Sequence, residues 1–394
     1  MTRPIRVAGR GRGGRAAVRA LLPLALVVCA CGGPILARPV PTPAVVETVP
    51  GPVASRLPDP QPIALPLDDG PHDRLTEWWY DTGHLVADDG RRFGFELVVF
   101  RAERGTLPVA WASHLAVTDE TGGRFLYDQR AQVGGDVSRP VEGGGFDLAV
   151  GRDVAPGIPE PGVVPWTMRG AGGRDQVAAA GVAGDGTGFG LRLDLESGGR
   201  PAVLHDHDGY VDFGDAGGSY YYSRTRLEAT GSLSVGDETM AVTGQAWFDH
   251  QWGDFIAVGG GGWDWFAVNL DDGTDVTLSL VRDATGAYPL AYGTLVRPDG
   301  TLRHLTDDTF EVEVSARWAS AATGADYPAG WHVSVPSEAL VIDLAPTVAA
   351  QELDTRATTG VVYWEGSQRV SATRDGVPLG GEGYVELTGY APCC

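Results

Sequence analysis

The 394-residue sequence contains no lysine, and all 30 of its Lys or Arg residues are arginines. Pyridoxal-phosphate enzymes and class I aldolases form a Schiff base on a lysine, so both classes are excluded. A Walker A nucleotide-binding loop also needs its lysine and is excluded as well. Two further signatures are missing: the G-x-S-x-G elbow of many serine hydrolases, and a G-x-G-x-x-G run placed after a strand, as in Rossmann dinucleotide sites. We expect a protein that uses no cofactor.

Cysteine and positive charge are scarce. Only four cysteines occur; Cys29 and Cys31 lie near the N-terminus, and Cys393 and Cys394 end the chain. Adjacent cysteines are poor disulfide partners, so we expect no disulfide framework. The terminal pair could bind a metal, cross-link two chains or form an unimportant frayed end. The net charge of −21 argues against a nucleic-acid partner.

The N-terminus has the layout of an export signal. An arginine-rich start without acidic residues precedes the apolar run "LLPLALVV" (Leu21–Val28), which is too short to span a bilayer. The following "VCACGG" resembles a bacterial lipobox with Cys31 as the acylated residue; Cys29, or an ordinary cleaved signal, are the alternatives. We predict a lipoprotein signal peptide over residues 1–30 and export, with the protein anchored to the membrane at the cell envelope or released as a periplasmic or secreted form.

The rest of the chain begins with a proline-rich stretch, residues 31–70, which predicts an extended linker. Beyond it, short strand patterns alternate with glycine turns. In "FGLRLDLES" (Phe189–Ser197) apolar and charged residues alternate, as in a half-buried strand. Pairs such as Asp89-Gly90 and Asp375-Gly376 are typical of hairpin turns. With no convincing amphipathic helix, the patterns predict an all-β fold.

The length of the folded part predicts two domains. Roughly twenty strands are too many for one small barrel, so we expect two antiparallel β-barrel domains packed side by side. We place the N-terminal barrel at residues 71–250 and the C-terminal barrel at 251–394. The boundary lies near "GQAWFDHQWGDF" (Gly244–Phe255), which is midway through the folded part and precedes a run of glycines.

Carboxylates occur among aromatic residues in two segments of strand pattern. In "WFDHQWG", alternation puts Trp247 and Asp249 on one face and His250 and Trp252 on the other. In "GWDWF", Trp263 and Trp265 share a face and Asp264 points the opposite way. Trp rings desolvate a carboxylate, which raises its pKa and favours a general-acid role. The alternative, favoured for any single aspartate, is that it accepts hydrogen bonds and orients the packing.

The stretch "EWWYDTGHL" (Glu77–Leu85) carries large aromatics on both faces of one strand. This pattern is explained if one face points into the first barrel and the other meets the second domain. Glu77, beside so much ring surface, should be paired, and Arg101 or Arg282 are candidate partners.

These patterns give a set of candidate site residues. We predict Asp249 or Asp264 as the acid, His250 as a base or orienting partner, and Glu77 as a further catalytic candidate. The predicted ligand-binding residues are Trp78, Trp79, Tyr80, His114, Trp247, Trp252, Trp263 and Trp265. We predict no metal site, because the pair His205 and His207 is a weak pattern without a specified third ligand.

Seven motifs, in order from Leu75 to Tyr390, resemble the AttH-like lipocalin family. They are "EWWYDTGHL" with "GRRFGFELVVFR", "ASHLAVTD", "LHDHDGYVDFG", "SYYYSRTRLEATG", "GQAWFDHQWG", "GWDWFAVNLDDG" and "GYVELTGY". This family includes carotenoid 1,2-hydratases and is similar to kievitone hydratase and fungal pericyclases. The resemblance implies two lipocalin-like β-barrels with an apolar pocket. The chain is closer to the exported bacterial members, many of which are described only as "predicted secreted hydrolase".

Two functions fit these observations. The first is a cofactor-independent enzyme that acts on an apolar, isoprenoid or polyketide-like substrate by acid–base hydration, isomerisation or hydrolysis. Hydration of an alkene needs an acid, aromatic faces for the carbocation and a carboxylate for the water. The second is an envelope lipoprotein that binds or carries a hydrophobic ligand without catalysis, because such pockets are mostly apolar. We expect a monomer in both cases.

Overall fold

The computed structural model describes residues 58–255 and 260–391. The predicted signal peptide, the lipidation site Cys31 and the terminal Cys393 and Cys394 lie outside these residues. Within them, the regular structure is strand apart from three short 3₁₀ helices, η1 (Leu67–Asp69), η2 (Gly214–Ala216) and η3 (Pro336–Glu338). No helix of the described part has the length and apolar character needed to cross a membrane. The all-β prediction is confirmed.

The first large sheet has 12 strands. Ten of them form an antiparallel path in the order β4-β3-β2-β1-β14-β13-β10-β9-β8-β5, and β11 and β12 pair with β13. Their bounds are β1 (Thr76–Ala87), β2 (Arg92–Ala102), β3 (Ala110–Asp119), β4 (Arg124–Val133), β5 (Phe146–Val150), β8 (Trp166–Ala171), β9 (Arg174–Val182), β10 (Gly188–Glu196), β11 (Val203–Leu204), β12 (Tyr210–Asp212), β13 (Gly218–Val235) and β14 (Glu238–Gly253). A separate small hairpin joins β6 (Asp153–Ala155) and β7 (Ile158–Pro159).

The second large sheet has 10 strands, with the path β18-β17-β16-β15-β26-β25-β23-β22-β19 and β24 paired with β25. Its strands are β15 (Gly260–Leu270), β16 (Asp275–Asp283), β17 (Leu290–Val296), β18 (Leu302–Thr306), β19 (Glu311–Val314), β22 (Trp331–Val335), β23 (Leu340–Pro346), β24 (Glu352–Asp354), β25 (Val362–Arg374) and β26 (Val377–Thr388). The strands β20 (Arg317–Ala319) and β21 (Asp326–Pro328) form a second small hairpin.

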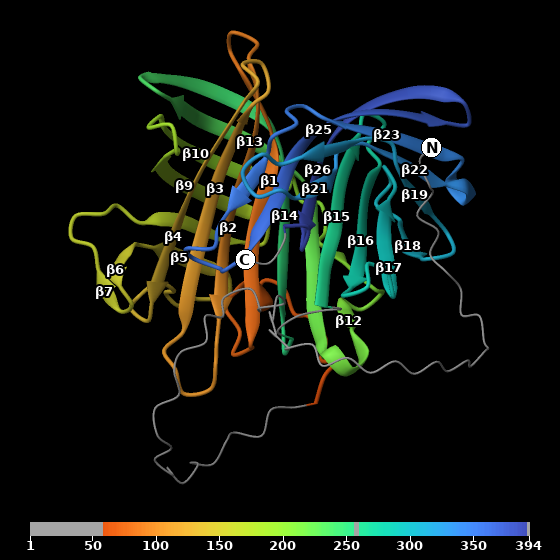
Figure 1. Ribbon diagram of the computed structural model, residues 1–394. Helices are drawn as coiled ribbons and strands as arrows, with labels where there is room; N and C mark the ends of the chain where they lie inside the picture. Colours follow the sequence, from red (N-terminus) through yellow and green to blue (C-terminus); the bar gives the residue numbers. More distant parts are fainter. Residues whose placement is uncertain (1–57, 256–259, 392–394) are drawn as a thin grey trace, which may run out of the picture.

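Both large sheets follow one plan. In each, a meander of four strands is followed by later strands that return to pair with the first, so β1 lies between β2 and β14, and β15 lies between β16 and β26. The sheets lie side by side as two lipocalin-like domains, with β1, β14, β15 and β26 between their outer parts (Figure 1). The change of sheet falls between Gly253 and Gly260. The predicted boundary after residue 250 lies inside β14, which continues pairing with β1 to its last residue.

The strands form where the sequence alternates, and the hairpins form where glycine permits a left-handed backbone. Along β10 the burial pattern alternates as predicted, with Leu191, Leu193 and Leu195 buried and Arg192 and Asp194 exposed. At the turn between β25 and β26, Asp375 and Gly376 both have positive φ, 50° and 76°. This geometry is that of the tightest hairpin turns and suits an Asp-Gly pair.

Four apolar clusters form among the described residues; the smallest joins Ala116 to Leu353 and Tyr363, and the other three are the main cores. The first core packs inside the first sheet and includes Trp79. The second core packs inside the second sheet and includes Trp364. A third lies between the domains and joins Tyr80 and Trp247 to Trp265 and Tyr384. The aromatics on both faces of β1 therefore serve two cores, as predicted from "EWWYDTGHL": Trp79 belongs to the first core and Tyr80 to the third.

The end of the predicted linker is part of the fold. Asp69 is completely buried, and its carboxylate pairs with Arg224 at 2.7 Å. Trp79 Nε1 donates to the main-chain oxygen of Asp69 at 2.9 Å. Proline-rich composition suggested an unpacked chain up to residue 70, but the buried ion pair fixes this segment on the first sheet.

The chain between β10 and β13 also connects the domains. It belongs to the first sheet through β11 and β12, yet in Figure 1 β12 lies beside the lower end of the second sheet. Contacts at His205 and His207 agree with this position, since His205 bonds to Thr294 of β17 and the His207 ring lies 4.0 Å from that of His304 in β18.

Candidate functional site

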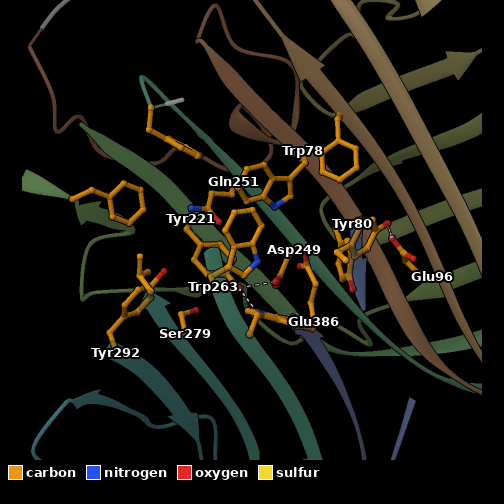
Figure 2. Close-up of a pocket in the computed structure, with 16 residues that line it drawn as sticks. Trp78, Tyr80, Glu96, Tyr221, Asp249, Gln251, Trp263, Ser279, Tyr292 and Glu386 are labelled. Carbon is orange, nitrogen blue, oxygen red and sulfur yellow. Dashed lines mark hydrogen bonds between the residues drawn. The ribbon is translucent and has the colours of Figure 1, made fainter. Parts of the chain in front are cut away.

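A pocket opens between the two domains, and we call it the seam pocket (Figure 2). It encloses about 770 Å³ of empty space, including the part that is open to solvent. Most of its wall is aromatic, with contributions from Trp78, Tyr80, Tyr221, Trp263 and Trp265. Three carboxyl groups also line it: Glu96 from β2, Asp249 from β14 and Glu386 from β26.

Strand alternation determines which residues reach the pocket. Trp78 and Tyr80 of β1 face the seam, as do Asp249 and Gln251 of β14. Their chain neighbours Trp79 and His250 point into the first core, where their rings stack at 4.7 Å. One strand therefore supplies both a packed core and a wall of the seam pocket, because successive side chains point to opposite faces.

Asp249 is held by three hydrogen bonds, two from β13 and one from its own strand, β14. Tyr221 donates to Oδ2 at 2.6 Å, and Trp247 Nε1 donates to Oδ1 at 2.7 Å. Ser223 donates to Oδ1 as well. These bonds stabilise the carboxylate, but burial has the larger effect and raises the pKa of Asp249 to about 6.

Behind Asp249 lies a chain of polar groups that crosses the domain boundary. His205 Nε2 is 2.7 Å from Ser223 Oγ, and His205 Nδ1 is 3.0 Å from Thr294 Oγ1. Burial lowers the pKa of His205 to about 3, so the ring is neutral at physiological pH. Since Ser223 donates to Asp249, His205 Nε2–H donates to Ser223. This chain fixes the orientation of the aspartate from the second domain.

Glu96 has a similar supporting chain. Tyr363 lies between Glu96 Oε1 and His114 Nδ1, at 2.8 Å from each. His114 Nε2 continues to Thr358 Oγ1 at 3.0 Å. Burial raises the pKa of Glu96 to about 8, with the nearby Glu386 adding to the rise. We predicted His114 as a ligand-binding residue, but it does not line the pocket. Instead it supports Glu96, which does.

Glu386 lines the pocket together with Asp249, and the two side chains lie near each other in Figure 2. Burial raises the pKa of Glu386 to about 7, and the charge of Asp249 adds to this effect. Another buried glutamate, Glu365, lies close behind, and burial together with Glu96 and Glu386 raises its pKa well above the ordinary value. Two carboxyls of different pKa facing one cavity are suited to acid–base chemistry near neutral pH.

Glu77 and His250 lie together, but in the first core. Glu77 Oε1 is 2.7 Å from His72 Nδ1 and 3.0 Å from His250 Nε2. Glu77 is thus paired with two histidines; of its predicted partners, Arg101 bonds to Glu103 and Arg282 pairs with Asp264. The paired imidazoles overcome the cost of burial and lower the pKa of Glu77.

The same three residues form the one group, within the part of the chain described, whose ligand atoms could share a metal ion, since these atoms lie within 4.8 Å of one another. The hydrogen bonds of Glu77 account for the arrangement without an ion. His205 and His207 do not converge, because His205 is buried against Ser223 and His207 lies on an exposed turn.

Asp264 faces the second core. Its carboxylate accepts hydrogen bonds from Tyr288 at 2.8 Å and Tyr390 at 2.9 Å, and Arg282 Nε lies 3.3 Å away. Asp264 therefore accepts hydrogen bonds and orients the packing, which was the alternative to a catalytic role for a single aspartate. Asp249 and Asp264 therefore do not share a site, because Asp249 faces the seam pocket and Asp264 faces the second core.

The predicted ligand-binding aromatics divide in the same way. Trp78, Tyr80, Trp263 and Trp265 line the seam pocket. Trp247 packs beside it and bonds to Asp249. Trp79 and Trp252 belong to the first core.

Sequence reasoning missed Glu96, Glu386, Tyr221 and Tyr363. A signal was present for both glutamates: each is a lone charge within a strand pattern that is otherwise apolar, "GFELVVF" and "GYVELTGY". Such a charge must face a partner or a cavity. What the sequence could not show is that strands so far apart bring these glutamates to the same cavity.

Comparisons with known proteins identify the family and the fold. A family model described as AttH-like matches residues 56–390. An AttH-like protein from Nitrosomonas europaea is 31% identical, and the alignment covers 84% of this chain and 98% of that one, with a TM-score of 0.71. Kievitone hydratase from Nectria haematococca shares the fold, with a TM-score of 0.60 at 17% identity, over 79% of this chain and 88% of the other. None of the curated proteins that were compared matches the chain. With the family model and the Nitrosomonas structure both spanning its two domains, the chain belongs to the AttH-like family.

Proposed function

We propose that the seam pocket is the active site of a cofactor-independent enzyme of hydratase type. One observation carries the proposal: Asp249 and Glu386 line the same aromatic pocket, with pKa values raised to about 6 and about 7. At neutral pH the aspartate is mostly ionised, while the glutamate retains its proton in about half of the molecules. The pair then contains one base and one acid.

The hydration step follows from these roles. Glu386 donates its proton to one carbon of an alkene, and the positive charge forms on the other carbon against the Trp78 and Trp263 rings. Asp249 takes a proton from water as the water oxygen bonds to the cationic carbon. The product gains one water, and the proton on Asp249 returns to Glu386 through solvent. Loss of a different proton from the cation would give isomerisation instead.

The kinship with a hydratase fold supports this reaction class, and the apolar wall supports an isoprenoid or polyketide-like substrate. Export with a lipid anchor on Cys31 and action as a monomer belong to the same proposal and are supported by the sequence pattern alone.

The test is turnover of a panel of prenylated phenols and polyenes in isotope-labelled water, followed by mass spectrometry. We expect the product to gain one labelled water, and Glu386→Gln and Asp249→Asn each to lower kcat by about 10²-fold or more. Asp264→Asn, which removes a buried carboxylate outside the pocket, is the control that should retain kcat.

Equal turnover by the pocket variants and the wild type would refute the assignment. An unmodified hydrophobic ligand that co-purifies with the protein, with no turnover across the panel, would establish the alternative function, a protein that binds or carries such a ligand.

A further inference from the structure

Several buried carboxylates outside the seam pocket have a cationic or imidazole partner, although Asp81 and Asp175 have no hydrogen-bond partner among the described residues. Asp69 pairs with Arg224, Asp264 with Arg282, and Asp275 with Arg226. Glu77 has its two histidines. The pairing compensates for the cost of removing each charge from water.

The seam carboxyls have no such partner. Among the described residues that line the pocket there is no arginine or histidine. Glu96 is only 1% exposed and lines the cavity, yet its Oε2 has no hydrogen-bond partner in the described part of the protein. Behind it, both oxygens of the completely buried Glu365 also lack one there. When these carboxyls ionise, they bring negative charge into the cavity that no cationic side chain of its lining balances.

The mouth of the pocket is suited to a cation of organic type. The Trp78 and Trp263 rings are nearly parallel, at 11°, with centroids 6.4 Å apart. Phe255 and Phe100 stand at steep angles to Trp78, with centroids at 5.7 Å and 6.4 Å. Faces of aromatic rings attract ammonium groups and bind quaternary ammonium ligands in cages of this kind.

We infer that the seam pocket binds an organic cation, an apolar ligand that carries a protonated amine or quaternary ammonium group. Uncompensated carboxyls inside the cavity would provide the opposite charge, and the indole and phenyl rings would contact the alkyl groups on nitrogen. An inorganic ion suits the pocket less, because the seam carboxylates are not among the groups close enough to share one ion. Hard cations also need a shell of oxygen ligands that an aromatic wall does not supply.

This inference rests on the seam pocket being the ligand site, as in the proposed function, but not on catalysis. It sharpens the substrate class from apolar to apolar and cationic. Because binding is measured at equilibrium and without turnover, an enzyme assay that fails leaves the binding result intact, and the reverse also holds.

The experiment compares choline with 3,3-dimethylbutan-1-ol, in which carbon replaces the charged nitrogen. Affinities for the purified protein are measured by calorimetry at constant ionic strength. At pH 8 we expect choline to bind at least about tenfold more tightly than the alcohol, since the shape is the same and the charge differs. At pH 5 the two should bind within about twofold of each other, because the carboxyls are then protonated.

The pH range follows from the groups that face the cavity. They are Asp249, Glu386 and Glu96, with raised pKa values of about 6, 7 and 8. Burial and neighbouring carboxyls also raise the pKa of Glu365, which lies behind them. The tyrosines Tyr80, Tyr221, Tyr292 and Tyr363 have pKa values raised above 10 and stay protonated throughout this range.

Four variants locate the effect. Glu386→Gln and Asp249→Asn should each weaken choline binding at pH 8 by about fivefold to tenfold and change alcohol binding by less than about twofold. Asp194→Asn removes the same charge from an exposed position on β10 and should change neither affinity. Trp263→Ala, which removes a ring at the mouth, should also weaken choline binding. It provides the test if Asp249→Asn does not fold.

Three results would overturn the inference. The alcohol could bind as tightly as choline at pH 8, calcium chloride could displace choline competitively at matched ionic strength, or neither compound could bind. The first would indicate a neutral ligand, the second an inorganic cation, and the third a pocket that does not bind a quaternary ammonium group.

Discussion

Asp249 and His250 are neighbours in the chain but act in different parts of the molecule. Asp249 faces the seam pocket, and burial raises its pKa to about 6. His250 is buried in the first core, where burial lowers its pKa. At the residue scale, the face of the strand and the available partners decide the chemistry more than the residue type does.

Glu386 gives a pH prediction at this scale. Its pKa of about 7 in the folded protein lies above its ordinary value of 4.5, so the folded state holds the proton more strongly. The contribution of Glu386 to stability is complete below about pH 4.5 and is lost as pH rises through about 7. Glu386→Gln should therefore increase the free energy of unfolding at pH 8 by roughly 1–3 kcal/mol and change it little at pH 4. Urea unfolding at both pH values measures this, and an equal effect at both would contradict it.

At the scale of elements, the segment with η1 is a structural part of the first domain. Its Asp69 pairs with Arg224 of β13 and accepts from Tyr222 as well. Arg224 is only 4% exposed, so removing its partner leaves a cation buried without compensation.

Asp69→Ala should lower the free energy of unfolding by about 3–5 kcal/mol. Asp88→Ala, at the exposed turn after β1, is the control and should change it by no more than about 0.5 kcal/mol. Chemical denaturation of both variants provides the comparison. A small loss for Asp69→Ala would mean that the segment is dispensable, as the linker prediction implied.

At the scale of the whole molecule, polar contacts hold the two domains together beside the pocket. Asp275 of β16 is completely buried and binds Arg226 at 2.6 Å and Thr225 at 2.8 Å, both from β13. His84 of β1 bonds to the main-chain oxygen of Gly383 in β26 at 2.9 Å. These contacts couple the stability of one domain to that of the other.

We expect the wild type to unfold in one cooperative transition. Asp275→Ala should lower its midpoint and separate it into two steps, because Arg226 then loses its partner at the domain boundary. Calorimetry with tryptophan fluorescence measures both the number of transitions and their midpoints. A single, unshifted transition would show that the apolar seam alone couples the domains.

Much of the fold could be predicted from the sequence. Alternation in "FGLRLDLES" and the Asp-Gly turns predicted strands and hairpins, because both are local properties of the chain. The seven motifs predicted the family. Of the residues predicted for the site, Asp249, Trp78, Tyr80, Trp263 and Trp265 line the seam pocket, whereas Glu77, His250 and Asp264 lie in the cores.

The amino-acid sequence by itself determined the strand faces, since a period of two places Asp249 opposite His250 and Trp263 opposite Asp264 whatever the fold around them. Only the tertiary structure decided which faces meet. Glu96, Asp249 and Glu386 come together because β1 and β14 of one sheet lie against β15 and β26 of the other. Pairing between distant strands depends on the packing of whole sheets, and local patterns carry no information about it.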